Sequence, residues 1–254
     1  MKCGLCHQDV DKLSKSHIIP RALHLLGEAK GNHQGLLVFS AEASEPVKRS
    51  HAGFYSRIVC AACEDSFKAG DDALIDVSRV HAHAAPIKDR SGNTDVVVFT
   101  NVDNATLHRG VITTLFRAHL SDNKFYKGVH LPPKFAEPLR RLLLSDEPTH
   151  VSTFDTVLHV TPTLYGRAIR SPERLRVEYI NTYWLTFPYW TAIVKVDGQK
   201  ALPFHQMRIG AYAHPVATLM PPLSPAEIEA FWKTMHGRKP EVSRITGMKF
   251  EQEK

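Results

Sequence analysis

The sequence predicts an α+β fold in which helices and antiparallel strands occupy separate stretches of the chain. Three observations lead to this prediction. The first 75 residues are polar, rich in histidine and framed by two Cys-x-x-Cys pairs. Apolar residues then recur at helical spacing between residues 104 and 144, and runs of β-branched and aromatic residues dominate 151–196.

The N-terminal part is expected to contain short strands and one helix. The apolar run at 35–39 has the pattern of a strand, and 57–59 would lead as a strand into the second cysteine pair. The segment 64–83 has an imperfect apolar face, which indicates a helix, although Gly70 lowers its propensity.

The central part is expected to begin with a buried strand at 95–99. Asn104 can then cap a helix that continues through 107–120. A second helix is predicted at 132–144, with proline tolerated in its first turn and Pro138 leaving its start uncertain.

The last third of the chain changes to the composition of strands. Four stretches are expected to be strands: 151–160, 174–180, 183–190 and 191–196. Asp197-Gly198 is a tight-turn signal between strands. Ser224 and Glu227 form a capping box that opens a helix ended by Gly237, and the charged tail from Arg238 is expected to be loose.

The length of 254 residues allows one large domain or a domain with a small module, and we predict a module at 1–80 and a body at 81–254. Neither a secretory signal nor an apolar run long enough for a membrane span is recognisable, which favours a cytoplasmic protein. A net charge of +6 is compatible with a polyanionic partner but does not require one. The aromatic run at 183–190 is expected to be core rather than a stacking surface for bases.

The four cysteines fall in two pairs with the same spacing, Cys3/Cys6 and Cys60/Cys63. In a reducing compartment such pairs are thiolate ligands more often than disulfides, and two knuckles complete a tetrahedron around Zn²⁺. A redox motif or incidental buried thiols are the alternatives. Redox motifs usually occur once, and no βαβ pattern surrounds these pairs, so a structural zinc site is predicted.

The order of motifs adds a resemblance. Cys-x-x-Cys is followed by Ser16-His17-Ile-Ile-Pro20 and then by Cys-x-x-Cys-Glu64, which resembles the zinc-containing HNH nucleases of the His-Me finger (treble-clef) group. The resemblance implies a zinc-bound ββα treble-clef module at the N-terminus. It also implies that His17 is the general base that activates water, and that a catalytic Mg²⁺ or Mn²⁺ is held nearby.

This sequence departs from the family pattern at three positions. Ser16 stands where the family has a metal-binding Asp, and Glu64 stands where it has His or Asn. Tyr55 and Ser56 occupy the place where an Asn is expected before Cys60. Glu64 offers a hard oxygen ligand for a divalent ion, whereas Ser16 would at best hold a metal-bound water.

A looser resemblance links the chain to bacterial HNH-like proteins associated with mobile elements or phage defence. It rests on the motifs Ser-His-Ile-Ile-Pro and Cys-x-x-Cys-Glu, with the arginine-containing segments 116–125 and 139–146. Arg49, His51 and Arg57 are candidates for phosphate contacts.

Two functions follow as hypotheses. The first is a metal-dependent endonuclease that cleaves phosphodiester bonds, with DNA favoured over RNA as its partner. The second is a catalytically inactive zinc module that binds nucleic acid or protein, for which Ser16 and the absent Asn are arguments. The sequence leaves open whether a homodimer or an accessory protein is also involved.

Overall fold

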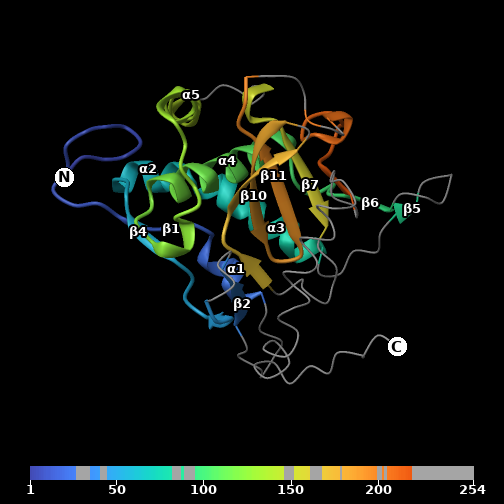
Figure 1. Cartoon of the computed structure of the whole chain (residues 1–254), viewed down its shortest axis with the longest axis horizontal. Helices are drawn as coiled ribbons and strands as arrows, with labels where there is room; N and C mark the ends of the chain where they lie inside the picture. Colours follow the sequence, from blue (N-terminus) through green and yellow to red (C-terminus); the bar gives the residue numbers. More distant parts are fainter. Residues whose placement is uncertain are drawn as a thin grey trace.

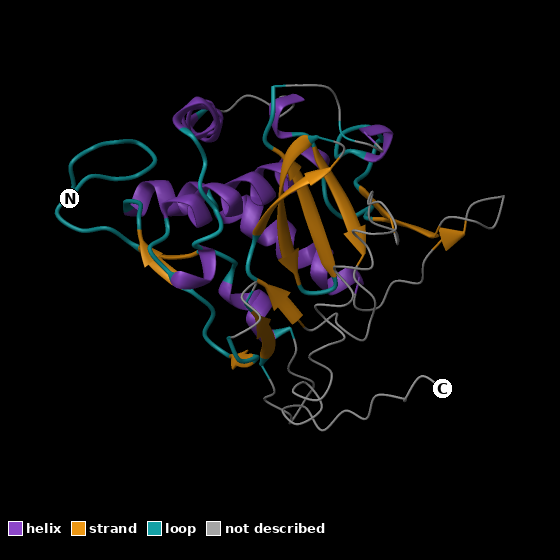
Figure 2. Ribbon diagram, viewed as in Figure 1, coloured by secondary structure: helices purple, strands orange, loops and turns teal. Residues whose placement is uncertain are grey.

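The computed structural model describes most of the chain and confirms the α+β class (Figures 1 and 2). The described residues are 1–26, 35–40, 45–81, 87–88, 95–145, 152–160, 168–177, 179–198, 202 and 205–218. The helix predicted between Ser224 and Gly237 and the tail after it lie outside this set.

A seven-stranded sheet forms the largest layer. Its strands, in spatial order, are β5 (Ile87–Lys88), β6 (Asp95–Val98), β12 (Val216–Thr218), β7 (Thr156–Val160), β11 (Trp190–Lys195), β10 (Ile180–Phe187) and β9 (Glu173–Val177). Neighbouring strands are antiparallel except β12 and β7, which are parallel. The predicted strands at 95–99 and 151–160 are therefore present, with a 3₁₀ turn at Ser152–Phe154 before β7.

Two of the predicted strands contain a chain reversal, so the prediction of one continuous strand for each was wrong. The stretch 174–180 turns at Tyr179 between β9 and β10, and 183–190 turns at Tyr189 between β10 and β11. Both tyrosines adopt φ of 71°, the left-handed conformation that lets the chain double back. The second reversal brings the rings of Phe187 and Trp190 into a stack with centroids 4.2 Å apart.

Helices α3 (Lys68–His81) and α4 (Asn104–Leu120) pack against one face of this sheet (Figures 1 and 2). The indole N–H of Trp190 donates to Ser78 Oγ of α3 at 2.8 Å. The two helices approach each other at Gly70 and Gly110, where a Cβ added to Gly70 would lie 2.7 Å from the Gly110 Cα. Gly70, which weakens the helix prediction from sequence, is thus required by the packing.

Helix α4 begins with a different cap from the one expected. The carboxylate of Asp103, not the side chain of Asn104, accepts a hydrogen bond from the Thr106 N–H at 2.9 Å. The Asn104 amide instead donates to the carbonyls of Tyr212 (2.8 Å) and Ala213 (3.2 Å). Asn104 therefore ties the start of α4 to the segment that leads into β12.

Asp197 and Gly198, where a tight turn is predicted, lie after β11, and the residues that directly follow them are outside the described set. The Asp197 carboxylate accepts hydrogen bonds from the backbone N–H of Asn181 (3.2 Å) and from its side-chain amide (2.7 Å). It therefore joins the end of β11 to the start of β10.

The remaining elements are short. They are β1 (Lys15–His17), α1 (Arg21–Leu25), β2 (Leu36–Phe39), β3 (Lys48–Ser50), β4 (Tyr55–Arg57), α2 (Ala61–Ser66), η1 (Lys124–Tyr126), α5 (Pro133–Leu144), β8 (Ala168–Arg170) and η4 (His205–Met207). Strands β1 and β4 form an antiparallel pair, and β2 lies between β3 and β8 in a three-stranded sheet. The strand expected at 57–59 spans 55–57 instead.

One hydrophobic core cluster contains side chains from both predicted modules, from Leu5 and Val59 to Trp190 and Ala217. The division at residue 80 concerns independent folding and stays a prediction. No helix among the described residues is both long and apolar enough to cross a membrane.

Candidate metal centre and adjoining polar site

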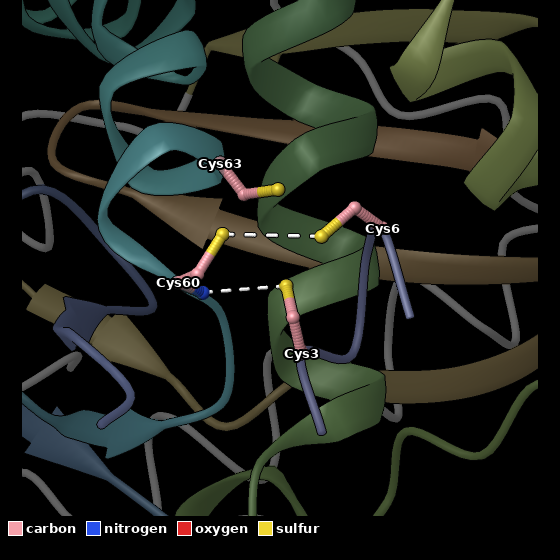
Figure 3. Close-up of side chains that lie close together, drawn as sticks. All are labelled: Cys3, Cys6, Cys60 and Cys63. Atoms are coloured by element: carbon pink, nitrogen blue, oxygen red, sulfur yellow. Dashed lines mark hydrogen bonds between the residues drawn. The ribbon is translucent and has the colours of Figure 1, made fainter. Parts of the chain in front are cut away.

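The four cysteines lie together although the two pairs are more than 50 residues apart in the sequence. The side chains of Cys3, Cys6, Cys60 and Cys63 point toward one another (Figure 3), and their sulfur atoms all lie within 4.8 Å of one another. The Cys6 and Cys60 sulfurs are 3.9 Å apart. Sulfurs at the corners of a tetrahedron with Zn–S bonds of about 2.3 Å are separated by about 3.8 Å, so this cluster could bind a metal such as zinc.

The first knuckle owes its shape to two residues around the cysteines. The Gly4 N–H donates to the Ile58 carbonyl at 2.8 Å, and a Cβ on Gly4 would lie 2.9 Å from the same oxygen. His7 adopts a left-handed φ of 61° and its N–H donates to the Cys3 carbonyl at 3.0 Å. Only a glycine at position 4 lets the knuckle approach the segment that leads into the second pair.

The second knuckle forms the start of α2. Cys60 precedes the first turn in an extended conformation, and the Glu64 N–H donates to its carbonyl at 3.0 Å. The Cys60 N–H also donates to the Cys3 sulfur at 3.3 Å (Figure 3). An amide that points at a sulfur of the other pair is the arrangement that stabilises a thiolate ligand.

The thiols influence one another strongly. Burial by itself raises the pKa of Cys3, but backbone amides of Cys6, Cys60 and Leu5 outweigh it and lower the pKa to about 7. Burial and the neighbouring thiols raise the pKa of Cys63 far above its ordinary value. Four thiolates cannot share this volume without a cation, so the donor set fits a divalent metal.

The β1–β4 pair lies beside this cluster and carries His17. His17 pairs with Tyr55 across the two strands, and their rings have centroids 6.0 Å apart. Ser16 is fully buried, whereas Lys15 and His17 reach the surface to different degrees, as strand alternation requires. Ser16 and His17, two of the site residues predicted from the sequence, thus lie on opposite faces of β1.

A buried polar cluster lies under this strand and was not predicted. Arg117 of α4 is completely buried and donates to both carboxylate oxygens of Asp71 in α3, with Nη1 to Oδ2 at 3.0 Å. The hydroxyl of Ser16 and the positive charge of Arg117 both act to lower the pKa of Glu64. Three buried polar atoms here have no hydrogen-bond partner among the described residues, namely Glu64 Oε2, Arg117 Nε and Tyr126 Oη, and the Ser16 hydroxyl lies close to the Glu64 carboxylate without a hydrogen bond of normal geometry.

Burial controls the charge of both predicted catalytic groups. It lowers the pKa of His17, the charges of Lys15, Arg21 and Arg117 lower it further, and Asp71 opposes them. His17 is therefore neutral near pH 7. Burial also raises the pKa of Glu64, and the Ser16 hydroxyl and Arg117 act in the opposite direction.

The three predicted phosphate contacts lie on or next to two different sheets. Arg57 pairs with Lys15 on the β1–β4 pair and donates from Nη1 to the Leu13 carbonyl at 3.1 Å. Arg49 lies in β3 of the three-stranded sheet around β2, and His51 follows the end of that strand. Whether any of them contacts phosphate stays a prediction.

The arginines of α5 have structural partners. Arg140 binds Glu137 (2.7 and 2.8 Å) and donates from Nη1 to the Leu5 carbonyl at 2.7 Å. Arg141 binds the same carboxylate at 2.8 Å. Arg140 therefore holds α5 against the first knuckle.

His24 is a second buried group beside the β1–β4 pair. It is fully buried, and neither ring nitrogen has a hydrogen-bond partner among the described residues. Burial, and then the nearby His17, lower its pKa to about 4. A Cβ on Gly53 would lie 2.8 Å from its Nε2, so the imidazole is packed directly against the backbone.

Comparisons with family models, with curated proteins and with solved structures gave no match.

Proposed function

We propose that this protein is a metal-dependent endonuclease built on a treble-clef module of the HNH-like type. In this proposal β1, β4 and α2 are the two strands and the helix of the module, with a zinc ion bound by the two cysteine pairs. The observation that supports it best is the buried polar cluster, in which the Glu64 carboxylate lies close to the Ser16 hydroxyl and its Oε2 has no hydrogen bond of normal geometry, beside the strand that carries a neutral His17. Buried polar atoms without partners are rare, and a bound ion is one of the arrangements that satisfies them.

His17 is suited to the role of general base. A neutral imidazole can take a proton from the attacking water, and the low pKa of His17 keeps it unprotonated at pH 7. Lys15 and Arg21, whose charges act on His17, would also attract a polyanionic substrate to this strand.

Glu64 is the residue proposed to hold the catalytic divalent ion, with Ser16 beside it. A carboxylate oxygen that is buried and unpartnered fits Mg²⁺ or Mn²⁺, which prefer oxygen ligands. The ion would supply positive charge at the phosphate and at the leaving oxygen. Asp71 is engaged by Arg117, so it orients that arginine rather than acting as a second metal ligand.

The experiment compares cleavage by wild type, His17→Ala and Glu64→Gln. Zinc-loaded protein is incubated with plasmid DNA and with RNA, in Mg²⁺, in Mn²⁺ and without either. We expect His17→Ala to cut about 10²- to 10⁴-fold more slowly, the usual contribution of a general base. Glu64→Gln should need more Mn²⁺ than wild type to reach the same rate.

His205→Ala is the matched control, because His205 is exposed on a different part of the surface. Equal rates for wild type and His17→Ala would remove His17 from the mechanism. If wild type cuts neither substrate in either metal, the alternative takes over, in which the zinc module binds nucleic acid or protein without cleaving it. Ser16 in place of the family's Asp is the residue that favours this alternative.

A further inference from the structure

A cavity opens between the loop around η1 and the edge strand β9, outside the site described above. Its volume is about 420 Å³, which lies within the range of ligand sites. The residues that line it are Ser40, Lys124, Phe125, Lys127, Gly128, Ser171, Pro172, Glu173, Arg174 and Leu175.

The charge of this cavity is positive. Lys124 and Arg174 are exposed at opposite walls, and the guanidinium of Arg174 has the neutral amide oxygen of Asn181 as a partner at 2.9 Å. The acidic residue of the lining, Glu173, is already paired with Arg170 at 2.7 Å. An anion entering the cavity would therefore meet uncompensated positive charge.

The walls are held at a fixed distance. A Cβ on Gly128 would lie 2.8 Å from the Pro172 carbonyl oxygen, so the η1 loop and the segment before β9 are in backbone contact at one end of the cavity. The opening is therefore part of the fold rather than a gap between loose side chains. Arg174 and Arg176 continue the positive charge along β9, where both are exposed.

The cavity is also joined to the strands that carry His17. Phe125 lines it and stacks on Phe54, with ring centroids 4.4 Å apart. The Phe54 carbonyl accepts a hydrogen bond from the Ile18 N–H at 3.1 Å. On the other side of the loop, Ser56 of β4 bonds to Asp122 at 2.9 Å. The loop that forms the cavity wall is thus fastened to β4 directly, and through Phe54 to Ile18, the residue that follows β1.

We propose that this cavity binds the phosphate backbone of a nucleic-acid strand at a position next to the phosphate on which His17 acts. Lys124 and Arg174 are the proposed phosphate ligands. That the ligand is a nucleic-acid strand follows from the proposed function, on which this inference therefore rests. The continuation of positive charge along β9 favours a polymer over a single small anion, because a compact anion would use the cavity alone.

The test measures binding separately from cleavage. Fluorescence anisotropy with labelled single- and double-stranded oligonucleotides, in zinc-loaded protein without added Mg²⁺ or Mn²⁺, gives the affinity at several salt concentrations. We expect Lys124→Gln/Arg174→Gln to bind roughly tenfold more weakly than wild type at low salt. The slope of log affinity against log salt should fall by about 1.4 for single strands and about 1.8 for duplex, the contribution of two phosphate contacts.

Lys134→Gln is the matched control, since Lys134 is an exposed lysine on α5. Its affinity and salt slope should equal those of wild type, and thermal midpoints should show that all variants are folded. If the double variant is unstable, Lys124→Glu alone changes an exposed side chain and is expected to weaken binding in the same direction.

The outcomes separate this inference from the proposed function. If His17-dependent cleavage is found but the double variant binds as wild type does, the cavity assignment is overturned and the nuclease stands. If the double variant loses binding while no metal supports cleavage, the cavity assignment stands and the nuclease fails. Displacement of the oligonucleotide by micromolar adenosine monophosphate, independent of strand length, would assign the cavity to a free nucleotide and overturn the proposal.

Discussion

The cysteine-framed region and the large sheet are stabilised in different ways. In β7 and β11 every residue is buried, and Phe187 and Trp190 fill the space between the sheet and α3. In β1 and β4 only Ser16 and Ser56 are buried, and both are polar. The sheet is stabilised by apolar burial, whereas we propose that the β1–β4 pair depends on a metal bound by the thiols beside it.

This difference matters for the proposed site, because the site lies in a region whose strands are short. Two strands with three residues each have too little apolar surface to fix a histidine and a carboxylate in position. A metal bound by two distant segments would add order to that of the apolar residues that flank the strands, and it would leave room for buried polar atoms nearby. The predictions below test this contrast.

Removal of the metal is expected to have the largest effect and to separate the two regions. Structural zinc sites contribute on the order of 10 kcal/mol to folding. A chelator, or Cys60→Ser/Cys63→Ser, should therefore abolish the hydrogen-exchange protection of β1 and β4 while β10 and β11 retain theirs. Hydrogen-exchange mass spectrometry measures both in one sample. Unchanged protection of residues 1–26 after chelation would contradict the dependence on metal.

The ion pair of Arg117 with Asp71 is expected to matter next, because it is the buried polar junction between α4 and α3. Asp71→Asn leaves a buried guanidinium without a counter-charge, which should lower the free energy of unfolding by about 3 to 5 kcal/mol. Chemical denaturation checks this. The double variant Asp71→Leu/Arg117→Met should lose less than the single variant. An equal or larger loss would show that the pair itself, rather than the unpaired charge, is what stabilises the junction.

Two of the buried histidines, His24 and His159, predict a pH dependence of stability in both regions. Burial lowers the pKa of His24, and that of His159 in the sheet, to about 4. Because these values lie below the ordinary 6.5, the folded protein binds fewer protons than the unfolded chain. Stability is therefore full above about pH 6.5 and falls toward pH 4, by about 3 kcal/mol for each histidine.

His24→Leu should remove the part of this loss that belongs to the N-terminal region, and the His159 part should persist. Denaturation at pH 7 and pH 4.5 measures the difference, with the exposed His205→Ala as control. If wild type and His24→Leu lose the same stability between the two pH values, His24 is not the group that titrates.

The smallest expected effect concerns the cap of α4, which lies on the side of the sheet. Asp103→Ala removes the acceptor for the Thr106 N–H and should lower stability by about 1 kcal/mol. Asn104→Ala is the comparison, since it removes contacts to Tyr212 and Ala213 but no cap. A change in zinc affinity caused by Asp103→Ala would show that the two regions are coupled more closely than proposed.

The features that the sequence made predictable are those with a local signature. The thiol cluster follows from two identical spacings, and the long helices follow from their apolar periodicity. The reversal at Tyr189 was missed because the run at 183–190 is aromatic and apolar apart from Thr186, with no polar turn residue. Pro188, a residue favoured at the second position of a tight turn, was the available signal. Tyr179 carries no such signal.

The buried polar cluster could not be derived from the sequence. Arg117 and Asp71 are 46 residues apart on two helices, and only the packing of α3 on α4 brings them together. Asp103 and Asn104 are both good capping residues, and which of them caps α4 is decided by the partners of Asn104 near Tyr212. Such choices depend on tertiary contacts and not on local preference.

The contact between Gly70 and Gly110 explains how a completely buried arginine finds its carboxylate. Asp71 follows Gly70 directly, and Arg117 lies seven residues, about two helical turns, after Gly110 on the same face of α4. Because neither glycine has a side chain, the axes of α3 and α4 can approach closely at this point. The close approach lets the Arg117 guanidinium reach the Asp71 carboxylate. An alanine at either glycine would act at a distance, by widening the crossing until Arg117 and Asp71 no longer meet, and so would disturb the surroundings of His17 without touching it.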